Sequence, residues 1–230
     1  MANTLFLRFE GPMQSWGERA RWSVRDTAPE PTKSGVVGLL GCALGLYADA
    51  DLRALSGQLR VGVRCDHAGS TIVDYHTVGG GYKKPALLTA EGKPKKSRGK
   101  PHTEETWRSY VCDASFLVAV QASPELIARL AEAVQRPHWP VFLGRKSCPP
   151  SQPVFEGAGE YQSLEAALRA WPMVQTASQS GRVDVRAVVE CSSDEGVRRR
   201  DEIDSRSHRT FLPRYAKEMI LTVHTEATKE

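Results

Sequence analysis

The stretch that decides the fold class runs from Phe116 to Val134 and reads FLVAVQASPELIARLAEAV. It opens with five apolar residues in a row, which is typical of a strand covered on both faces of a sheet. A helix is predicted to follow, because Ser123 suits the N-cap and Pro124 suits the first helical position. Apolar residues then recur at helical spacing at Leu126, Ile127, Leu130, Ala131 and Val134. This pattern predicts a protein in which helices pack on a sheet.

Outward from this stretch, strands and helices alternate along the chain. The predicted strands are Thr4–Phe9, Leu59–Cys65, Thr71–Val78, Phe116–Val120 and Trp139–Leu143. We expect the second and third of these to form a hairpin. A helix is predicted from about Ser34 to Tyr47, with Thr32 or Ser34 as its N-cap. The order strand, helix, strand, strand, helix, strand is close to a ferredoxin-like or RRM-like unit, so the sequence predicts an α+β fold.

The chain after Gly144 has a different pattern. A short helix is predicted after Ser163, and Val183–Cys191 and Met219–Thr225 are predicted to be strands. We therefore expect an RRM-like unit at residues 1–144 and a smaller β-rich region at residues 145–230.

Composition excludes several classes of protein. With 230 residues, 40% of them hydrophobic and 25% charged, and a net charge of +4, the chain is of an ordinary globular kind. Its five cysteines are far apart and its six histidines are scattered, so we expect no zinc site, disulfide framework or other metal site. No signal peptide is predicted at the N-terminus, and the longest apolar run, Gly35–Ala48, is shorter than the roughly 20 residues of a membrane span. These features predict a cytoplasmic protein without a cofactor.

The glycine-rich helix does not contain a nucleotide-binding loop. A phosphate-binding loop places Lys and Ser or Thr after its last glycine, but Lys33 and Ser34 precede the glycines here. Glycines at this spacing are expected to let the helix pack closely on the sheet. The helix start is a separate candidate, because a cation, hydroxyl groups and free backbone N–H groups can hold a nucleic-acid phosphate.

The strongest concentration of charge lies in the middle of the chain. Between Lys83 and Arg108 there are eight cations and three glutamates, a local excess of five positive charges. A solvated linker is one explanation. Two strands bound this segment, however, and it also holds Tyr82 and Trp107. We therefore predict a long β-hairpin arm, at about residues 79–108, that becomes ordered on RNA.

Two further segments carry basic residues beside special backbone or aromatic residues. Gly144 is followed by Arg145 and Lys146, which could hold a phosphate at the end of a strand, although a plain surface loop fits almost equally well. The segment Arg206–Tyr215 (RSHRTFLPRY) interleaves basic and aromatic residues, which suits stacking on unpaired bases. The upstream segment, Arg198–Asp204, has balanced charge and is predicted to be a solvated surface.

The loop after the first strand holds an unusual set of side chains. It reads GPMQSWGERARW from Gly11 to Trp22. Gln14 and Trp16 suit contact with RNA or with a partner protein. The alternative is that the two tryptophans anchor the loop to the core, which we favour for Trp22 and leave open for Trp16.

Three motifs together resemble a known family. GPMQSWG after the first strand, PTKSGVVGLLGCALG at the helix and LGRKSCPP after a later strand resemble the CasD subunits of type I-E CRISPR Cascade, in the RAMP superfamily. The resemblance covers nearly the whole chain and is most specific in its first ~50 residues and around Gly144–Pro150. It implies a modified RRM fold with a protruding β-hairpin thumb and a small C-terminal β-rich lobe.

The resemblance also implies a function. The protein would bind the 5′ handle of the guide RNA (crRNA) and contact the backbone subunit CasC, the large subunit CasA and other Cascade subunits. The residues that we assign to RNA are Gln14, Trp16, Arg19, Lys33, Ser34, Lys83, Lys84, Lys95, Lys96, Arg98, Lys100, His102, Trp107, Arg108, Arg145, Lys146, His208 and Arg209. Among them, Gln14, Trp16, Lys33, Ser34, Arg145 and Lys146 are carried over from the family motifs.

Two alternatives remain. In a related Cascade branch the similar subunit is a metal-independent endoribonuclease that uses Tyr, Lys and His. The corresponding candidates here are Tyr47, His76, Lys83, Lys84 and His102, but the sequence contains no adjacent Lys-His pair, so we predict no catalytic residues. A free-standing RNA-binding module is less favoured, since many apolar and aromatic groups lie in loops.

Overall fold

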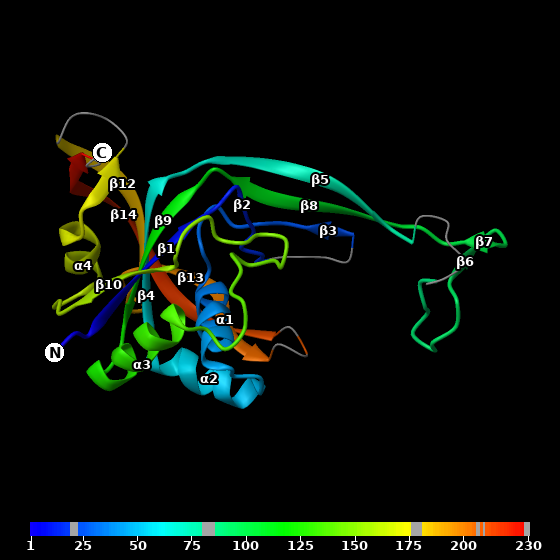
Figure 1. The fold of residues 1–230 in the computed structure, drawn as a ribbon, viewed down its shortest axis with the longest axis horizontal. Helices are drawn as coiled ribbons and strands as arrows, with labels where there is room; N and C mark the ends of the chain where they lie inside the picture. The colour runs from blue at the N-terminus through cyan, green and yellow to red at the C-terminus, as the bar shows by residue number, and fades with distance from the viewer. Residues whose placement is uncertain (19–22, 80–85, 176–180, 206–207, 209, 228–230) are drawn as a thin grey trace.

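The computed structural model describes residues 1–18, 23–79, 86–175, 181–205, 208 and 210–227 (Figure 1). Its largest feature is an eight-stranded sheet in which β1 (Thr4–Glu10) lies between β10 (Phe155–Gly159) and β9 (Ser115–Gln121). β9 pairs on its other side with β4 (Arg60–His67), and these three pairs are all antiparallel. The protein thus has a mixed α+β fold on a largely antiparallel sheet.

The same sheet continues into the C-terminal part of the chain. β4 pairs with β12 (Gly181–Glu190), and β12 pairs with the long β14 (Thr210–Ala227). β14 in turn pairs with β13 (Val197–Ser205) and β11 (Met173–Gln175). The predicted boundary at Gly144 therefore does not separate two sheets, and the segment Arg198–Asp204 belongs to a strand rather than to a purely solvated surface.

Helices cover both faces of the sheet. They are α1 (Lys33–Leu44), α2 (Asp49–Gln58), α3 (Pro124–Gln135) and α4 (Leu164–Ala170). The first three share a core with Leu5 and Phe9 of β1, whereas Phe6 faces α4 and stacks on Trp171. Because both faces are buried, β9 is apolar from Phe116 to Val120, and the charged residues that β1 and β4 bury, such as Arg8, are held in ion pairs. No single described helix is long and apolar enough to span a membrane, although α1 and α2 pass that test together with a bend of 116°.

The helix starts are confirmed, but one strand prediction is wrong. The hydroxyl groups of Thr32, Ser123 and Ser163 cap α1, α3 and α4 as expected. Trp139–Leu143 is not a strand, and the strand that follows α3 and pairs with β1 is β10. Pro140 has no N–H group for a ladder. The backbone of Leu143 instead closes a turn by donating to the Cys148 carbonyl at 2.7 Å and accepting from Ser15 N–H at 3.0 Å.

The predicted hairpin of Leu59–Cys65 and Thr71–Val78 is also wrong. β4 and β5 (Ser70–Val78) are instead successive parts of one bent strand, which pairs with β9 and then with β8 (Glu104–Cys112). His67 faces Ser115 inside the sheet and Ser70 faces Cys112 outside it, so the register continues across the bend. β5 and β8 form an arm that projects far from the body (Figure 1).

Short strands complete the arm. β2 (Met13–Gln14) pairs with β8 close to the body, and β3 (Val24–Arg25) pairs with it farther out, at Trp107 and Arg108. At the far end, β6 (Lys96–Ser97) pairs with β7 (Lys100–Pro101). The described residues of the basic segment predicted at about residues 79–108 therefore form the outer part of a longer arm, whose strands begin at Ser70 and end at Cys112.

The bend between sheet and arm depends on two residues with positive φ. Gly69 has a φ of 65° and Asp113 a φ of 57°. A Cβ atom on Gly69 would overlap the Cys112 carbonyl oxygen, so the two bent strands approach each other more closely than a side chain allows. His67 Nδ1 lies 2.5 Å from the Asp113 carbonyl oxygen, and this contact links the two strands at the bend.

The substitution Gly69→Ala is expected to destabilise the protein by about 1–3 kcal/mol, because it adds both strained backbone and an overlap at the bend. Urea unfolding measures this change. The matched control is Gly57→Ala in α2, where an added Cβ meets no atom within 4 Å. The control should leave stability unchanged or raise it by about 0.4–1 kcal/mol. Equal stability of the two variants would contradict this account of the bend.

Candidate nucleic-acid interface

The far end of the arm carries exposed cations. Lys96, Arg98 and Lys100 lie on or between β6 and β7, and all three are exposed. Lys95 and His102 differ from them, because both lie against one carboxylate. Lys95 Nζ is 2.6 Å and His102 Nε2 is 3.1 Å from Glu104 Oε2. Lys95 first, and then His102, lowers the pKa of the Glu104 carboxyl group. The positive charge that is available to a ligand therefore lies on Lys96, Arg98 and Lys100.

Aromatic residues lie in the middle of the arm. Trp107 on β8 is directly opposite Tyr75 on β5, and their ring centroids are 5.6 Å apart. Both rings are exposed, by 42% and 55% respectively. Arg108 lies half-buried and donates from Nε to Thr106 Oγ1 at 3.2 Å. Trp107 is thus accessible as predicted, whereas Arg108 already has a contact within the arm.

Arg145 is used inside the protein. Its guanidinium group donates to the carbonyl oxygens of Ser109, Arg25 and Asp26 at 3.1–3.4 Å. It also lies over the Tyr110 ring, 4.6 Å from the centroid. Arg145 therefore ties the loop after Gly144 to the base of the arm, and the prediction that it binds a phosphate does not fit this placement.

Gln14 and Trp16 also belong to the interior. Gln14 is fully buried and donates from Nε2 to the Phe9 and Ala114 carbonyl oxygens at 3.1 and 2.8 Å. Its Oε1 accepts from Trp16 Nε1 at 3.2 Å, and the Trp16 ring stacks on Phe9. All polar groups of the two side chains are satisfied within the core, so the prediction that they contact RNA is corrected. The loop holds an amide and a tryptophan because they close the core beneath it.

Lys33 is buried in an ionic cluster. Its side chain is 2% exposed, and Nζ lies 3.0 Å from Glu190 Oε1 and 3.1 Å from Glu202 Oε1. The backbone N–H of Lys33 donates to Asp201 Oδ2 at 3.0 Å, so a carboxylate from β13 occupies the positive end of α1. The proposed phosphate site at this helix start is therefore filled by the chain itself.

The same cluster includes a second buried cation. Arg214 forms two hydrogen bonds with Asp201, at 2.7 and 2.8 Å. Burial alone would lower the pKa of Arg214, but the carboxylates of Asp201, Glu190 and Glu202 together outweigh it and raise that pKa above its ordinary value. Asp201 thus joins α1 to β13 and β14. The sequence analysis missed this role, although Asp201 and Ile203 stand at alternating positions, as inward-facing strand residues do.

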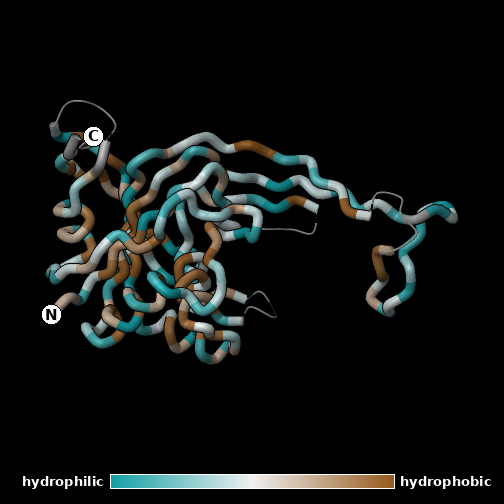
Figure 2. The backbone as a smooth tube through the Cα atoms, viewed as in Figure 1, coloured by the Kyte–Doolittle hydropathy of each residue, from teal (hydrophilic) through white to brown (hydrophobic). Residues whose placement is uncertain are grey.

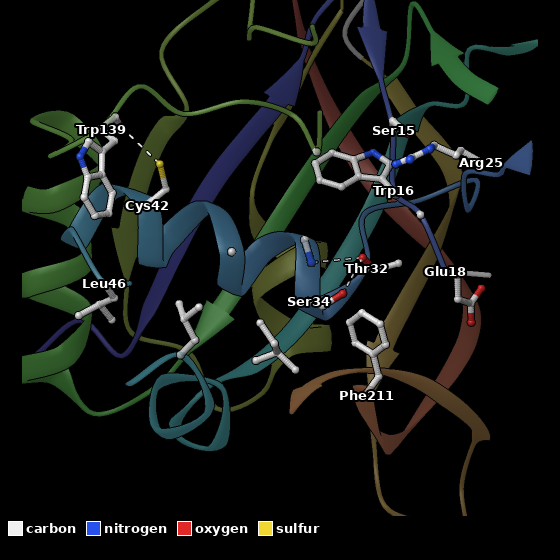
Figure 3. Close-up of a pocket in the computed structure, with 16 residues that line it drawn as sticks. Ser15, Trp16, Glu18, Arg25, Thr32, Ser34, Cys42, Leu46, Trp139 and Phe211 are labelled. Atoms are coloured by element: carbon white, nitrogen blue, oxygen red, sulfur yellow. Dashed lines mark hydrogen bonds between the residues drawn. The ribbon is translucent and has the colours of Figure 1, made fainter. Parts of the chain in front are cut away.

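A groove of 740 Å³ runs along the outer side of α1 (Figure 3). Ser34, Gly38 and Cys42 form its floor on the helix, and Trp16 and Arg25 lie above Ser34 at one end. Leu46 and Trp139 lie at the other end, where Cys42 Sγ contacts the Trp139 carbonyl oxygen at 3.7 Å. Of the predicted α1 candidates, Ser34 therefore faces an open surface while Lys33 does not.

The remaining predicted residues divide into two groups. Lys146 and His208 are exposed, as a contact with RNA requires. Arg19, Lys83, Lys84 and Arg209, together with Trp22 and Tyr82, lie outside the described residues. Over the described part of the chain, no group of three or more His, Cys, Asp or Glu side chains could hold a metal ion.

Comparison with known proteins gives the family. The model of the family described as CRISPR-associated protein (Cas_Cas5) matches residues 4–223. The chain belongs to this family. It is also 38% identical over 181 residues to the CRISPR system Cascade subunit CasD of Escherichia coli (strain K12), covering 73% of this chain and 76% of that protein. The resemblance drawn from the three sequence motifs is thereby confirmed.

Two solved structures share the fold. One, described as a CRISPR RNA-guided surveillance complex, contains a chain with a TM-score of 0.81 and 29% identity, over 96% of this chain and 91% of that one. The other, a crystal structure of a Cas protein, gives a TM-score of 0.67 and 33% identity, over 95% and 94% of the two chains. The likeness extends over almost the full length of this family member.

The substitution Lys33→Met should lower the free energy of unfolding by about 3–5 kcal/mol, because Glu190 and Glu202 would lose their buried counter-ion. The matched control is Lys217→Met, which breaks the ion pair with Glu195 on the surface. That change should cost no more than about 1 kcal/mol. Urea unfolding of both variants measures the difference, and equal losses would show that Lys33 is not a structural cation.

Proposed function

We propose that this protein is a non-catalytic, crRNA-binding subunit of a Cascade-type CRISPR surveillance complex, where it holds the 5′ handle of the guide RNA. The proposal is supported by membership in the Cas5 family and by the similarity to CasD. The observation that carries it is the projecting arm with exposed cations at its far end (Figure 1). Phosphate groups are the natural ligands of such a surface.

The architecture supports a specific assignment of parts. β1, α1, β4, β9, α3 and β10 follow one another in the order of a ferredoxin-like unit, with the strands arranged as β10-β1-β9-β4. We infer that this unit is the modified RRM core of the RAMP superfamily and that the arm is its thumb. Neighbouring backbone and large subunits of the CasC and CasA kinds would then contact the arm and the body.

The RNA-binding surface that we propose is narrower than the one predicted from sequence. It keeps the exposed cations Lys96, Arg98, Lys100 and Lys146, together with His208 and with Ser34 on the groove. It leaves out Gln14, Trp16, Lys33 and Arg145, because these side chains are satisfied inside the protein. RNA would therefore be held by the arm and by loop surfaces rather than by buried motif residues.

The pair of changes Lys96→Gln and Lys100→Gln should weaken binding of a single-stranded handle RNA and reduce its dependence on salt. The slope of log Kd against log salt should fall by about 1.4, since each phosphate contact to a single strand contributes about 0.7. Fluorescence anisotropy at several salt concentrations measures both quantities. The control pair, Arg129→Gln and Arg136→Gln, removes two exposed cations at α3, far from the arm. An unchanged slope in the arm variant would overturn the assignment.

We also expect no cleavage of CRISPR repeat RNA by the purified protein in EDTA. Tyr47 follows α1, whereas His76 and His102 lie on the arm, where His76 contacts Asp74 and His102 contacts Glu104. General acid–base catalysis would require these groups to meet at one scissile bond. Gel analysis of labelled repeat RNA tests this. A discrete product that disappears in His76→Ala or His102→Ala would identify an endoribonuclease instead.

A further inference from the structure

The outer edge of β5 is open along the arm. Among the described residues, β5 pairs with β8 alone. The N–H of Trp107 donates to Ser23 on the far side of β8, so Trp107 and Tyr75 form a non-hydrogen-bonded pair of the antiparallel ladder. By alternation, the backbone N–H and C=O groups of Thr71, Val73, Tyr75 and Thr77 point away from β8, to the outside of the arm.

This edge lacks most of the features that normally prevent strand addition. Exposed edges are usually shortened, bulged, or protected by charged residues or Pro. β5 is nine residues long, keeps one register throughout and contains no Lys, Arg or Pro, and its one acidic residue is Asp74. Two other exposed strands are protected: β10 has five residues and a register shift, and β13 has two shifts and three consecutive arginines. Of these three edges, only that of β5 has neither a register shift nor an arginine.

The side chains around this edge suit a protein partner rather than RNA. Val24, Trp107 and Tyr75 lie in register across three strands, and Val73, 62% exposed, follows on β5. Figure 2 shows a hydrophobic stretch in β5 between polar segments of the arm. Carboxylates lie on both faces of the ribbon, from Asp74 next to the edge and from the exposed Glu105 opposite Thr77. The exposed lysines lie farther out, and the two arginines of the ribbon, Arg25 and Arg108, are half-buried, so the exposed charge of the ribbon is mainly acidic and that of the far end is basic.

We propose that the outer edge of β5 binds an extended segment of another protein subunit as an added β-strand. The outward backbone groups would supply the hydrogen bonds, while Val73, Tyr75 and Trp107 would supply apolar contact. A basic residue of the added strand would lie opposite Asp74. A second copy of this chain fits less well, because an antiparallel pair of β5 strands centred on Asp74 would place two carboxylates face to face.

This inference rests on the proposed place in a multi-subunit complex. The complex is assembled by co-expression of the full chain with the CRISPR subunits encoded beside it and a guide RNA. Hydrogen–deuterium exchange, resolved to single amides, then compares the free and assembled chain. We expect the amides of Thr71, Val73, Tyr75 and Thr77 to exchange at least about tenfold more slowly in the complex. The inward amides of Ile72, Asp74 and His76 are the internal control.

Two variants test the backbone contact itself. Val73→Pro removes one outward N–H without removing a bond to β8, and should cut the yield of complex at least about tenfold. Val73→Ile keeps both the N–H and an apolar side chain and should assemble normally. Thr77→Pro repeats the test at a second site, and a thermal melt with exchange of the inward amides verifies the fold of each variant. Binding of handle RNA by the free Val73→Pro protein should be unchanged.

Each contrary result has a separate meaning. A complex that forms with the β5 amides exchanging as in the free chain, or that forms normally with both proline variants, overturns this inference alone. Protection by RNA without other subunits would assign the edge to RNA. Protection that rises with the concentration of the free chain would assign it to a second copy. A wild-type chain that joins no complex would overturn the proposed function together with this inference.

Discussion

Two strands at the centre of the sheet, β4 and β9, extend beyond its boundary and stay paired, and most of the molecule follows from this constraint. Inside the sheet they bury both faces, and their register shifts once, between Cys65 and His67. Outside it the same two strands become β5, which is largely exposed, and β8, which keeps buried residues at Thr106, Tyr110 and Val111. The arm is therefore anchored in the core by continuous backbone rather than attached through a loop, and its direction depends on the bend at Gly69 and Asp113.

A second constraint is electrostatic. Buried charges are tolerated only when they are paired and hydrogen-bonded. Lys33, Asp201 and Arg214 satisfy this requirement together with Glu190 and Glu202, and they join α1 to strands almost 170 residues later in the chain. Arg8 plays a comparable part on the other face, between Asp66 at 2.6 Å and Glu156 at 3.2 Å. The first cluster uses Lys33, which a sequence motif alone assigns to RNA.

Local signals in the sequence were sufficient for much of the fold. The caps at Thr32, Ser123 and Ser163 and the apolar runs of β1 and β9 depend on neighbouring residues, and these predictions are confirmed. The errors at Trp139–Leu143 and at the hairpin of Leu59–Val78 concern pairing between distant strands, which no short window of sequence specifies. The site was harder still, because burial decides the role of a cation or an amide. Lys33 and Lys96 look alike in sequence, yet one has two carboxylate partners and the other lies in solvent.

The ionic cluster at the start of α1 also determines when the protein can finish folding. The ribosome releases Lys33 early, but its partner Asp201 and the strand β14 that holds Arg214 are synthesised about 170 residues later or more. Until they emerge, the positive end of α1 lacks its carboxylate and one edge of β12 lacks its neighbour. The nascent chain therefore exposes a charged helix end, and later an open strand as well, until β13 and β14 have emerged.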